Sequence, residues 1–316
     1  MFDTVRIGIS SCLLGQKVRF DGGHKRDVFL VETFGKFVEW VPLCPEVEIG
    51  LGTPREAIRL VRDAGGVRLI GVKSAADHTD RMRGWAVHRA DLLARETLDG
   101  YILKKDSPSC GMERVKVYTP GGVPSRDGRG LFAEALIARL PLLPVEEEGR
   151  LSDPRLRDHF VERVFAHRRL RDVFAGRWTA GSLVAFHSAQ KLALLAHSPS
   201  GYAGLGRLVA RAGEMPRAEL RAEYEAGYMK SLSSMATPRR HVNVLQHIAG
   251  YFKKVLDEDS RRELAAAIAD YQAGLVPLIV PITLVRHHVR RCGISYLEGQ
   301  VYLEPHPKEL MLRNHV

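Results

Sequence analysis

The sequence contains little cysteine and no long apolar run. Only four of its 316 residues are cysteine, which is too few for a disulfide scaffold and favours a reducing, cytoplasmic location. The longest apolar candidate, residues 275–285, is interrupted by Pro277 and Pro281 and falls short of the roughly 20 residues of a membrane-spanning helix. The opening residues run into a strand-like segment without a signal-peptide pattern. We therefore expect a cytoplasmic, globular protein with no membrane partner.

The cysteines also lack the Cys-x-x-Cys spacing that typical zinc sites use. Cys12, Cys44 and Cys110 stand singly in small-residue, turn-forming settings, and each follows, or nearly follows, an apolar run that predicts a buried strand. Because parallel strands end at the same edge of a sheet, where α/β folds build their sites, we expect the three thiols to meet there. They could hold a metal or a [4Fe–4S] cluster whose fourth iron is open. Three buried structural cysteines are the alternative. Cys292, in the helical half, is not expected to be a ligand.

Strand-like and helix-like segments alternate through the first half of the chain, which predicts an α/β domain with a parallel, doubly wound sheet. Residues 54–63 are interpreted as a polar connection or helix. The expected strands are 5–10, 37–43, 67–72, 100–104, 115–118 and 142–145, and the expected helices are 28–34, 79–98 and 131–140.

A seam rich in proline and glutamate at residues 141–154 separates the two halves, and beyond it the strand pattern nearly disappears. The remaining segments have helical periodicity and predict an all-α C-terminal domain. We place the domains at residues 1–148 and 149–316. The expected helices of the second domain are 155–175, 180–196, 202–213, 216–235, 238–257, 259–272 and 279–290.

Positive charge is concentrated in the second half. Residues 1–150 carry 23 Lys and Arg against 21 Asp and Glu, whereas residues 151–316 carry 24 against 16 and ten of the thirteen histidines. A basic domain favours a polyanionic partner, most commonly RNA or DNA. The alternative is a set of arginine-rich helices whose charges are simply solvated.

Residues that can move protons lie beside the cysteines. Glu46, two positions after Cys44, is a candidate general base. Ser107 and Ser109 flank a proline just before Cys110, and a hydroxyl there can relay a proton or hold a substrate carbonyl, although Ser-Pro-Ser is also an ordinary turn. The stretch 50–55, with two glycines, a proline and an arginine, can cradle a ligand or merely end a segment.

The same segments resemble a known family. Residues 7–15, Ile-Gly-Ile-Ser-Ser-Cys-Leu-Leu-Gly, are similar to the opening motif of the TudS-type thiouracil desulfidases. Residues 44–55 and 103–111, which hold the other two cysteines, are similar to the second and third motifs. Residues 239–253, Arg-Arg-His-Val-Asn-Val-Leu-Gln-His-Ile-Ala-Gly-Tyr-Phe-Lys, resemble the helical domain of YbgA-like proteins. The two-domain arrangement resembles the RudS-type tRNA 4-thiouridine desulfidases.

The resemblance implies a [4Fe–4S] cluster held by Cys12, Cys44 and Cys110, with a thiocarbonyl sulfur bound at the open iron. Water would then replace sulfur on the pyrimidine ring without net redox change. In this reading Glu46 activates the water, and Ser107 or, alternatively, Ser109 relays a proton or orients the substrate. The implied activity is hydrolytic conversion of 4-thiouridine in tRNA to uridine.

The helical half would then capture the RNA. Arg239, Arg240, His241, Lys253 and Lys254 lie on one predicted helix or its entry, and two aromatic residues, Tyr251 and Phe252, stand between the charges. Cations contact phosphates and aromatic rings stack on unpaired bases. Two other functions stay open: desulfidation of free thiouracil or thionucleosides, and a non-enzymatic iron–sulfur protein that binds RNA or senses oxygen or iron.

Overall fold

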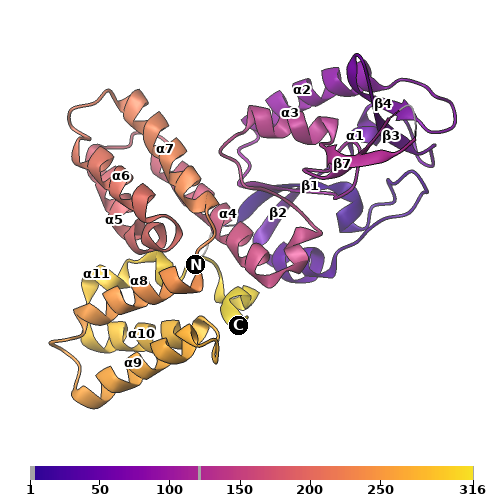
Figure 1. The fold of residues 1–316 in the computed structure, drawn as a ribbon. Coiled ribbons are helices and arrows are strands. Elements are labelled where there is room, and N and C mark those ends of the chain that lie inside the picture. Colours follow the sequence, from indigo (N-terminus) through magenta and orange to yellow (C-terminus); the bar gives the residue numbers. More distant parts are fainter. Residues whose placement is uncertain (1–3, 120–121, 316) are drawn as a thin grey trace. The chain divides into compact units, whose positions relative to one another are not determined.

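A computed structural model describes residues 4–119 and 122–315 of the chain (Figure 1). The chain folds as two compact units, residues 1–156 and 157–316. The seam between the units lies a few residues beyond position 148, within the first turn of helix α4 (Pro154–Phe174).

A four-stranded sheet forms the centre of the first unit. Its order is β2 (Val38–Leu43), β1 (Val5–Ser10), β5 (Gly100–Leu103) and β8 (Val145–Glu147), and all neighbouring strands are parallel. This sheet confirms the predicted α/β class, and it makes neighbours of the three strands that precede the cysteines. Their carboxyl ends therefore share one edge of the sheet.

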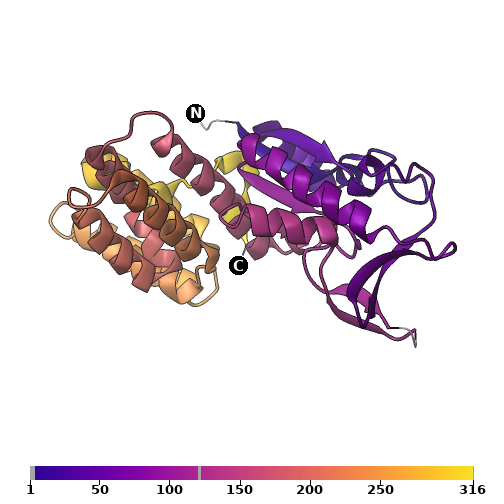
Figure 2. The same ribbon diagram turned by 90° about the horizontal axis from the view of Figure 1, so that it is seen from above.

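Helices α2 (Thr79–Arg95) and α3 (Leu131–Arg139) lie side by side over one face of this sheet (Figure 2). Helix α2 buries Met82, Ala86, Ala90 and Leu93, whose spacing of three or four residues forms a single apolar stripe. Tyr101 of β5 and Phe132 of α3 pack edge to face in the core between the layers, with ring centroids 5.7 Å apart.

A second sheet corrects the expectation of one continuous parallel sheet. Its order is β4 (Gly66–Gly71), β3 (Ile58–Asp63), β6 (Val115–Tyr118) and β7 (Pro124–Gly128). The interpretation of residues 54–63 as a connection or helix was wrong over 58–63. This segment pairs antiparallel with β4 in a tight hairpin whose turn uses the positive φ of Gly66. Arg62 remains exposed, Arg59 is half-buried and Leu60 is buried.

Two smaller differences concern the first unit. The expected helix at 28–34 is a π-helical turn, Phe29–Thr33, followed by a 3₁₀ turn, Phe34–Phe37. The last strand of the central sheet begins at Val145, three residues later than expected. Glu146 and Glu147 therefore belong to β8 and Glu148 follows it, although the sequence suggested that these glutamates were part of a linker.

The second unit is helical, as predicted. One apolar cluster of this unit joins α5 (Ala180–His197), α8 (Pro238–Tyr251), α9 (Glu258–Gln272) and α10 (Ile279–Cys292) with the segment that follows them. Helix α8 ends at Tyr251, although the sequence predicted a helix to residue 257. Phe252 is buried in the core, and residues 252–255 form a turn. After α4 the helices are α5 (Ala180–His197), α6 (Pro199–Ala210), α7 (Arg217–Ser233), α8 (Pro238–Tyr251), α9 (Glu258–Gln272), α10 (Ile279–Cys292) and α11 (Ser295–Glu298).

Within residues 4–119 and 122–315, no helix has the length and apolar character needed to cross a membrane.

Candidate active site

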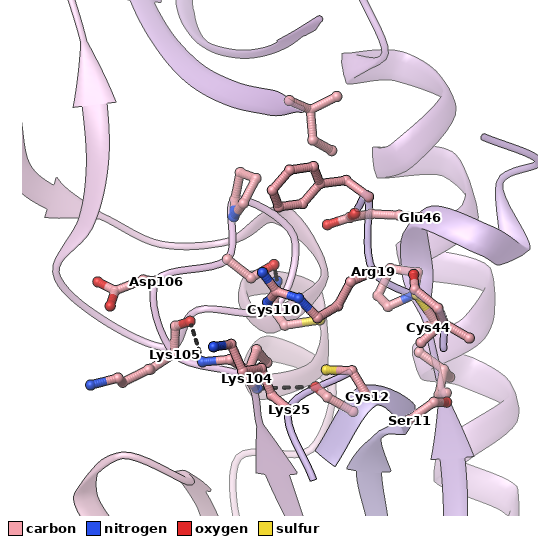
Figure 3. A pocket seen from close by; sticks show the side chains of 18 of the residues that line it. Ser11, Cys12, Arg19, Lys25, Cys44, Glu46, Lys104, Lys105, Asp106 and Cys110 are labelled. Carbon is pink, nitrogen blue, oxygen red and sulfur yellow. Dashed lines mark hydrogen bonds between the residues drawn. The ribbon is translucent and has the colours of Figure 1, made fainter. Parts of the chain in front are cut away.

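The three cysteines of the first unit line one cavity at the carboxyl edge of the central sheet (Figure 3). Cys12 lies in a 3₁₀ turn directly after β1, Cys44 caps the short helix α1 (Pro45–Glu48) after β2, and Cys110 lies in the loop after β5. The cavity has a volume of about 470 Å³. Glu46 and Ser107 also line it, so the structure brings these predicted residues together.

The loop that carries Cys110 is held by hydrogen bonds to its backbone. The Ser107 hydroxyl oxygen accepts hydrogen bonds from the amides of Ser109, at 3.2 Å, and Cys110, at 3.1 Å. The first amides of α3 donate to carbonyls of the same loop. Gly130, just before α3, has no room for a side chain, because a Cβ there would lie 2.5 Å from the Ser109 carbonyl. Local hydrogen bonding therefore fixes the position of Cys110.

Glu46 is oriented by two partners. The Ser109 hydroxyl, which is fully buried, donates to Glu46 Oε1 at 3.0 Å. The Arg55 guanidinium donates to Glu46 Oε2 through both Nε, at 3.1 Å, and Nη2. The side chains of Arg55 and Glu46 are only 5% and 14% exposed. Charge-assisted bonds of this kind, sheltered from water, hold the carboxylate in one position at the cavity wall.

Arg55 also ties together the loops around the cavity. Its Nη1 donates to the carbonyls of Val18, at 3.0 Å, and Gly52, at 2.7 Å, and its amide donates to the Phe20 carbonyl. Arg55 therefore joins the segment after Cys12 to the carboxylate beside Cys44. Sequence reasoning did not find this role. The only signal was an arginine within a glycine- and proline-rich stretch.

A second buried ion pair supports the opposite side of the cavity. Lys104 Nζ lies 2.5 Å from Glu148 Oε1, and the other oxygen of Glu148 accepts the Lys105 amide at 2.8 Å. The Lys104 amide in turn donates to the Ser10 hydroxyl at 3.0 Å. Glu148 directly follows β8, so its carboxylate reaches the Lys104 and Lys105 segment near the cysteines. The glutamate run at 146–148 is therefore part of the domain, although the sequence suggested a linker.

Burial determines the protonation of the thiols. It raises the pKa of Cys12 to about 11, although the Lys104 ammonium opposes the shift, and it raises the pKa of Cys44 and, still more, that of Cys110. The Cys44 thiolate would repel that of Cys12, both would repel that of Cys110, and the Glu46 carboxylate adds to the pKa shifts of Cys44 and Cys110. All four cysteines of the chain are free thiols. Three such thiols become stable anions only beside a cation, which is the condition that metal coordination supplies.

The donor set fits a cluster better than a single ion. Across the described residues, no group of three or more His, Cys, Asp or Glu side chains converges closely enough to hold one metal ion. In an iron–sulfur cluster each cysteine binds a different iron, so the sulfurs surround a shared space without meeting at a point. Three thiols around one cavity are a donor set that such a cluster can use.

The predicted RNA-binding residues of the second unit have different environments. Arg239, Lys253 and Lys254 are exposed at the surface. Arg240 Nη1 donates to the His197 carbonyl at 2.7 Å. His241 faces inward: its Nδ1 lies 2.9 Å from the hydroxyl of the buried Tyr302, and burial lowers its pKa to about 3. A neutral, inward imidazole is a poor phosphate ligand, so His241 is removed from the set.

Known proteins are similar to both units. A family model described as 2-thiouracil desulfurase matches residues 7–148, and one described as a protein of unknown function (DUF1722) matches residues 191–307. The uncharacterised protein YbgA of Escherichia coli (strain K12) is 35% identical over 161 residues, which is 51% of this chain and 95% of YbgA. The chain belongs to the family of YbgA, and its residues 7–148 form a domain of the 2-thiouracil desulfurase type.

Two further proteins are similar to parts of the chain. The uncharacterised protein YbbK of Bacillus subtilis (strain 168) is 32% identical over 111 residues, which is 33% of this chain and 71% of YbbK. A solved structure described as the [4Fe-4S]-dependent thiouracil desulfidase TudS is 31% identical, covering 47% of this chain and 93% of that chain, with a TM-score of 0.38. The desulfurase domain at residues 7–148 makes the protein an enzyme, a desulfidase.

Proposed function

We propose that this protein is a [4Fe–4S]-dependent desulfidase that converts 4-thiouridine in tRNA to uridine. The observation that carries the proposal is the meeting of three free thiols and an oriented carboxylate at one cavity, in a domain of the desulfurase type. Cys12, Cys44 and Cys110 would hold the cluster, and the solved relative described as [4Fe-4S]-dependent supports that cofactor. When bound, the cluster supplies an open iron, a soft Lewis acid for a thiocarbonyl sulfur.

The chain's own residues manage water and protons. Glu46 accepts a proton from the attacking water, and it is ready to do so because Ser109 and Arg55 fix both carboxylate oxygens. Ser107 lines the cavity while its oxygen orders the Cys110 loop, which leaves its own proton available for relay. Overall, a carbon–oxygen bond forms, the carbon–sulfur bond breaks and sulfur leaves as hydrogen sulfide with the two protons of water. No oxidant or reductant is required.

The tRNA substrate is supported by charge. The second half of the chain carries eight more Lys and Arg than Asp and Glu, 24 against 16, and the exposed Arg239, Lys253 and Lys254 can contact phosphates. The alternative substrate, free thiouracil or a thionucleoside, would need no such domain. A non-enzymatic sensor would have no use for an oriented Glu46.

The test is anaerobic. Reconstituted protein is mixed with bulk tRNA containing 4-thiouridine, or with free thiouracil, and the products are quantified after digestion. We expect 4-thiouridine to become uridine and this conversion to fail in Glu46→Ala at unchanged iron content. Reaction of free thiouracil alone would reject the tRNA substrate, and reaction of neither would favour the sensor.

A further inference from the structure

Helix α8 presents an exposed polar face that its packing does not require. Residues 242, 245, 248 and 252 point into the core, whereas Arg239, Asn243, Gln246, His247 and Tyr251 recur at intervals of three or four residues on the exposed side. We call these five residues the α8 face. Within the described residues, the side chains of Asn243 and Gln246 form no hydrogen bond and Arg239 forms no ion pair.

A pair of tyrosines stands at the end of this face. Tyr251 is 40% exposed, and its ring stacks on that of Tyr296 from α11, with centroids 5.1 Å apart and planes 22° apart. His247 lies edge-on to Tyr251, with centroids 5.6 Å apart. The neighbouring Phe252 is fully buried, so Tyr251 is the aromatic residue of this segment that a ligand can reach.

The segment that carries Tyr251 has charge of one sign, whereas helix α11, which carries Tyr296, holds one acidic residue, Glu298. Residues 238–254 include Arg239, Arg240, Lys253 and Lys254 and no Asp or Glu. In the part of the chain that the structure describes, Lys253 and Lys254 form no ion pair. A face of cations, amides and an accessible ring matches the three parts of an unpaired nucleotide: a phosphate, a base edge and a flat π-surface.

We propose that Tyr251, backed by Tyr296, is a stacking site for an unpaired base of RNA, with Lys253 and Lys254 at the adjoining phosphates. This inference rests on the proposed tRNA substrate and names the surface that would bind it. Because Tyr296 already holds the Tyr251 ring in place, little side-chain freedom is lost on binding.

The affinity of the reconstituted full chain for bulk tRNA, measured by fluorescence anisotropy over a range of salt concentrations, tests this site. We expect Tyr251→Ala to weaken binding about tenfold with an unchanged salt slope, and Tyr251→Phe to bind like the wild type. The double change Lys253→Gln and Lys254→Gln should reduce the salt slope, because fewer counterions are released. Val184→Ala, at an exposed apolar position of α5, is the matched control and should bind like the wild type.

The outcomes separate this inference from the proposed function. Wild-type binding that Tyr251→Ala leaves intact would overturn the stacking site alone. An equal loss in Tyr251→Phe and Tyr251→Ala would show that the hydroxyl acts, which also overturns stacking. Failure of the wild type to bind tRNA while it still desulfurises free thiouracil would reject the tRNA substrate and the site together.

Discussion

Ser109 and Glu46 are 63 positions apart in the sequence, yet the Ser109 hydroxyl donates a hydrogen bond to Glu46 Oε1 at 3.0 Å. The bond links the loops of two cysteines, since Glu46 follows Cys44 and Ser109 precedes Cys110. It also separates two serines that the sequence alone could not distinguish. Ser109 orients the carboxylate, whereas Ser107 accepts backbone amides and borders the cavity.

Substitution of Ser109 and of Ser107 should have different effects on turnover and iron content. Ser109→Ala removes a donor from Glu46 but no support from Cys110, so we expect turnover to fall about tenfold to a hundredfold at wild-type iron content. Ser107→Ala removes the acceptor of two amides in the Cys110 loop, and we expect it to lose iron as well as turnover. Iron assays beside single-turnover rates check both results. Wild-type turnover in Ser109→Ala would contradict the role given to that hydroxyl.

Removal of Arg55 should cost stability as well as activity. Arg55→Ala removes the ion-pair partner of the Glu46 carboxylate in a sheltered site and the bonds to the Val18 and Gly52 carbonyls, which predicts a loss of about 3 kcal/mol in the free energy of unfolding. Arg55→Lys keeps the charge but cannot make the same set of bonds, so a smaller loss is expected.

Denaturant titration of the full chain measures these losses. The matched control is Arg62→Ala, which breaks the exposed Arg62–Asp127 pair and should change stability by less than about 1 kcal/mol. Equal effects of Arg55→Ala and Arg62→Ala would show that burial of the Glu46 pair contributes nothing.

The cysteines provide the sharpest test of the ligand set. Cys12→Ala, Cys44→Ala and Cys110→Ala should each lose the iron and the brown absorbance of the reconstituted protein, because each thiol would bind a different iron. Cys292→Ala should keep both, since Cys292 lies in the other compact unit. Iron content that is the same in all four variants would refute the assignment.

Much of the fold follows from local pattern. Apolar runs at 5–10, 37–43 and 100–104 predicted three strands, which the structure has at 5–10, 38–43 and 100–103, and parallel pairing then predicted a common edge for the loops that follow them. Helical periodicity predicted the second unit in the same way. These predictions were correct because the buried residues of a strand or a helix form a local pattern that can be seen in the sequence alone.

What could not be predicted depends on contacts between distant residues. Strand β3 carries two arginines, the half-buried Arg59 and the exposed Arg62, and only pairing with β4 and β6 shows that it belongs to a separate sheet. Nothing in the sequence distinguishes Arg55 and Glu148 from surface charges, because their ion-pair partners, Glu46 and Lys104, are distant in the chain or in another segment. His241 looked like a phosphate ligand because its neighbours are cationic, whereas its own position on the helix turns it inward to Tyr302.

The inward His241 predicts a pH dependence of stability. Burial, reinforced by Arg313, lowers its pKa to about 3, and burial lowers the pKa of His159 to about 4. As the pH falls below about 6.5, the unfolded chain takes up these protons and the folded chain does not, so stability decreases with falling pH. His197 acts in the opposite direction: burial opposes its charge, but Glu162 outweighs burial and raises its pKa, so its contribution is lost as the pH rises.

His241 alone should remove about 2 kcal/mol from the free energy of unfolding between pH 7 and pH 5. In His241→Gln, which can still bond the Tyr302 hydroxyl but does not titrate, the dependence on pH should be shallower by that amount. Denaturant titrations at a series of pH values, followed by far-ultraviolet circular dichroism, measure the difference. Asn243→Gln, at an exposed position of the same helix, changes no titrating group and should follow the wild-type curve. If His241→Gln follows it too, the imidazole is protonated in the folded protein and its inward contact with Tyr302 does not exclude the charge.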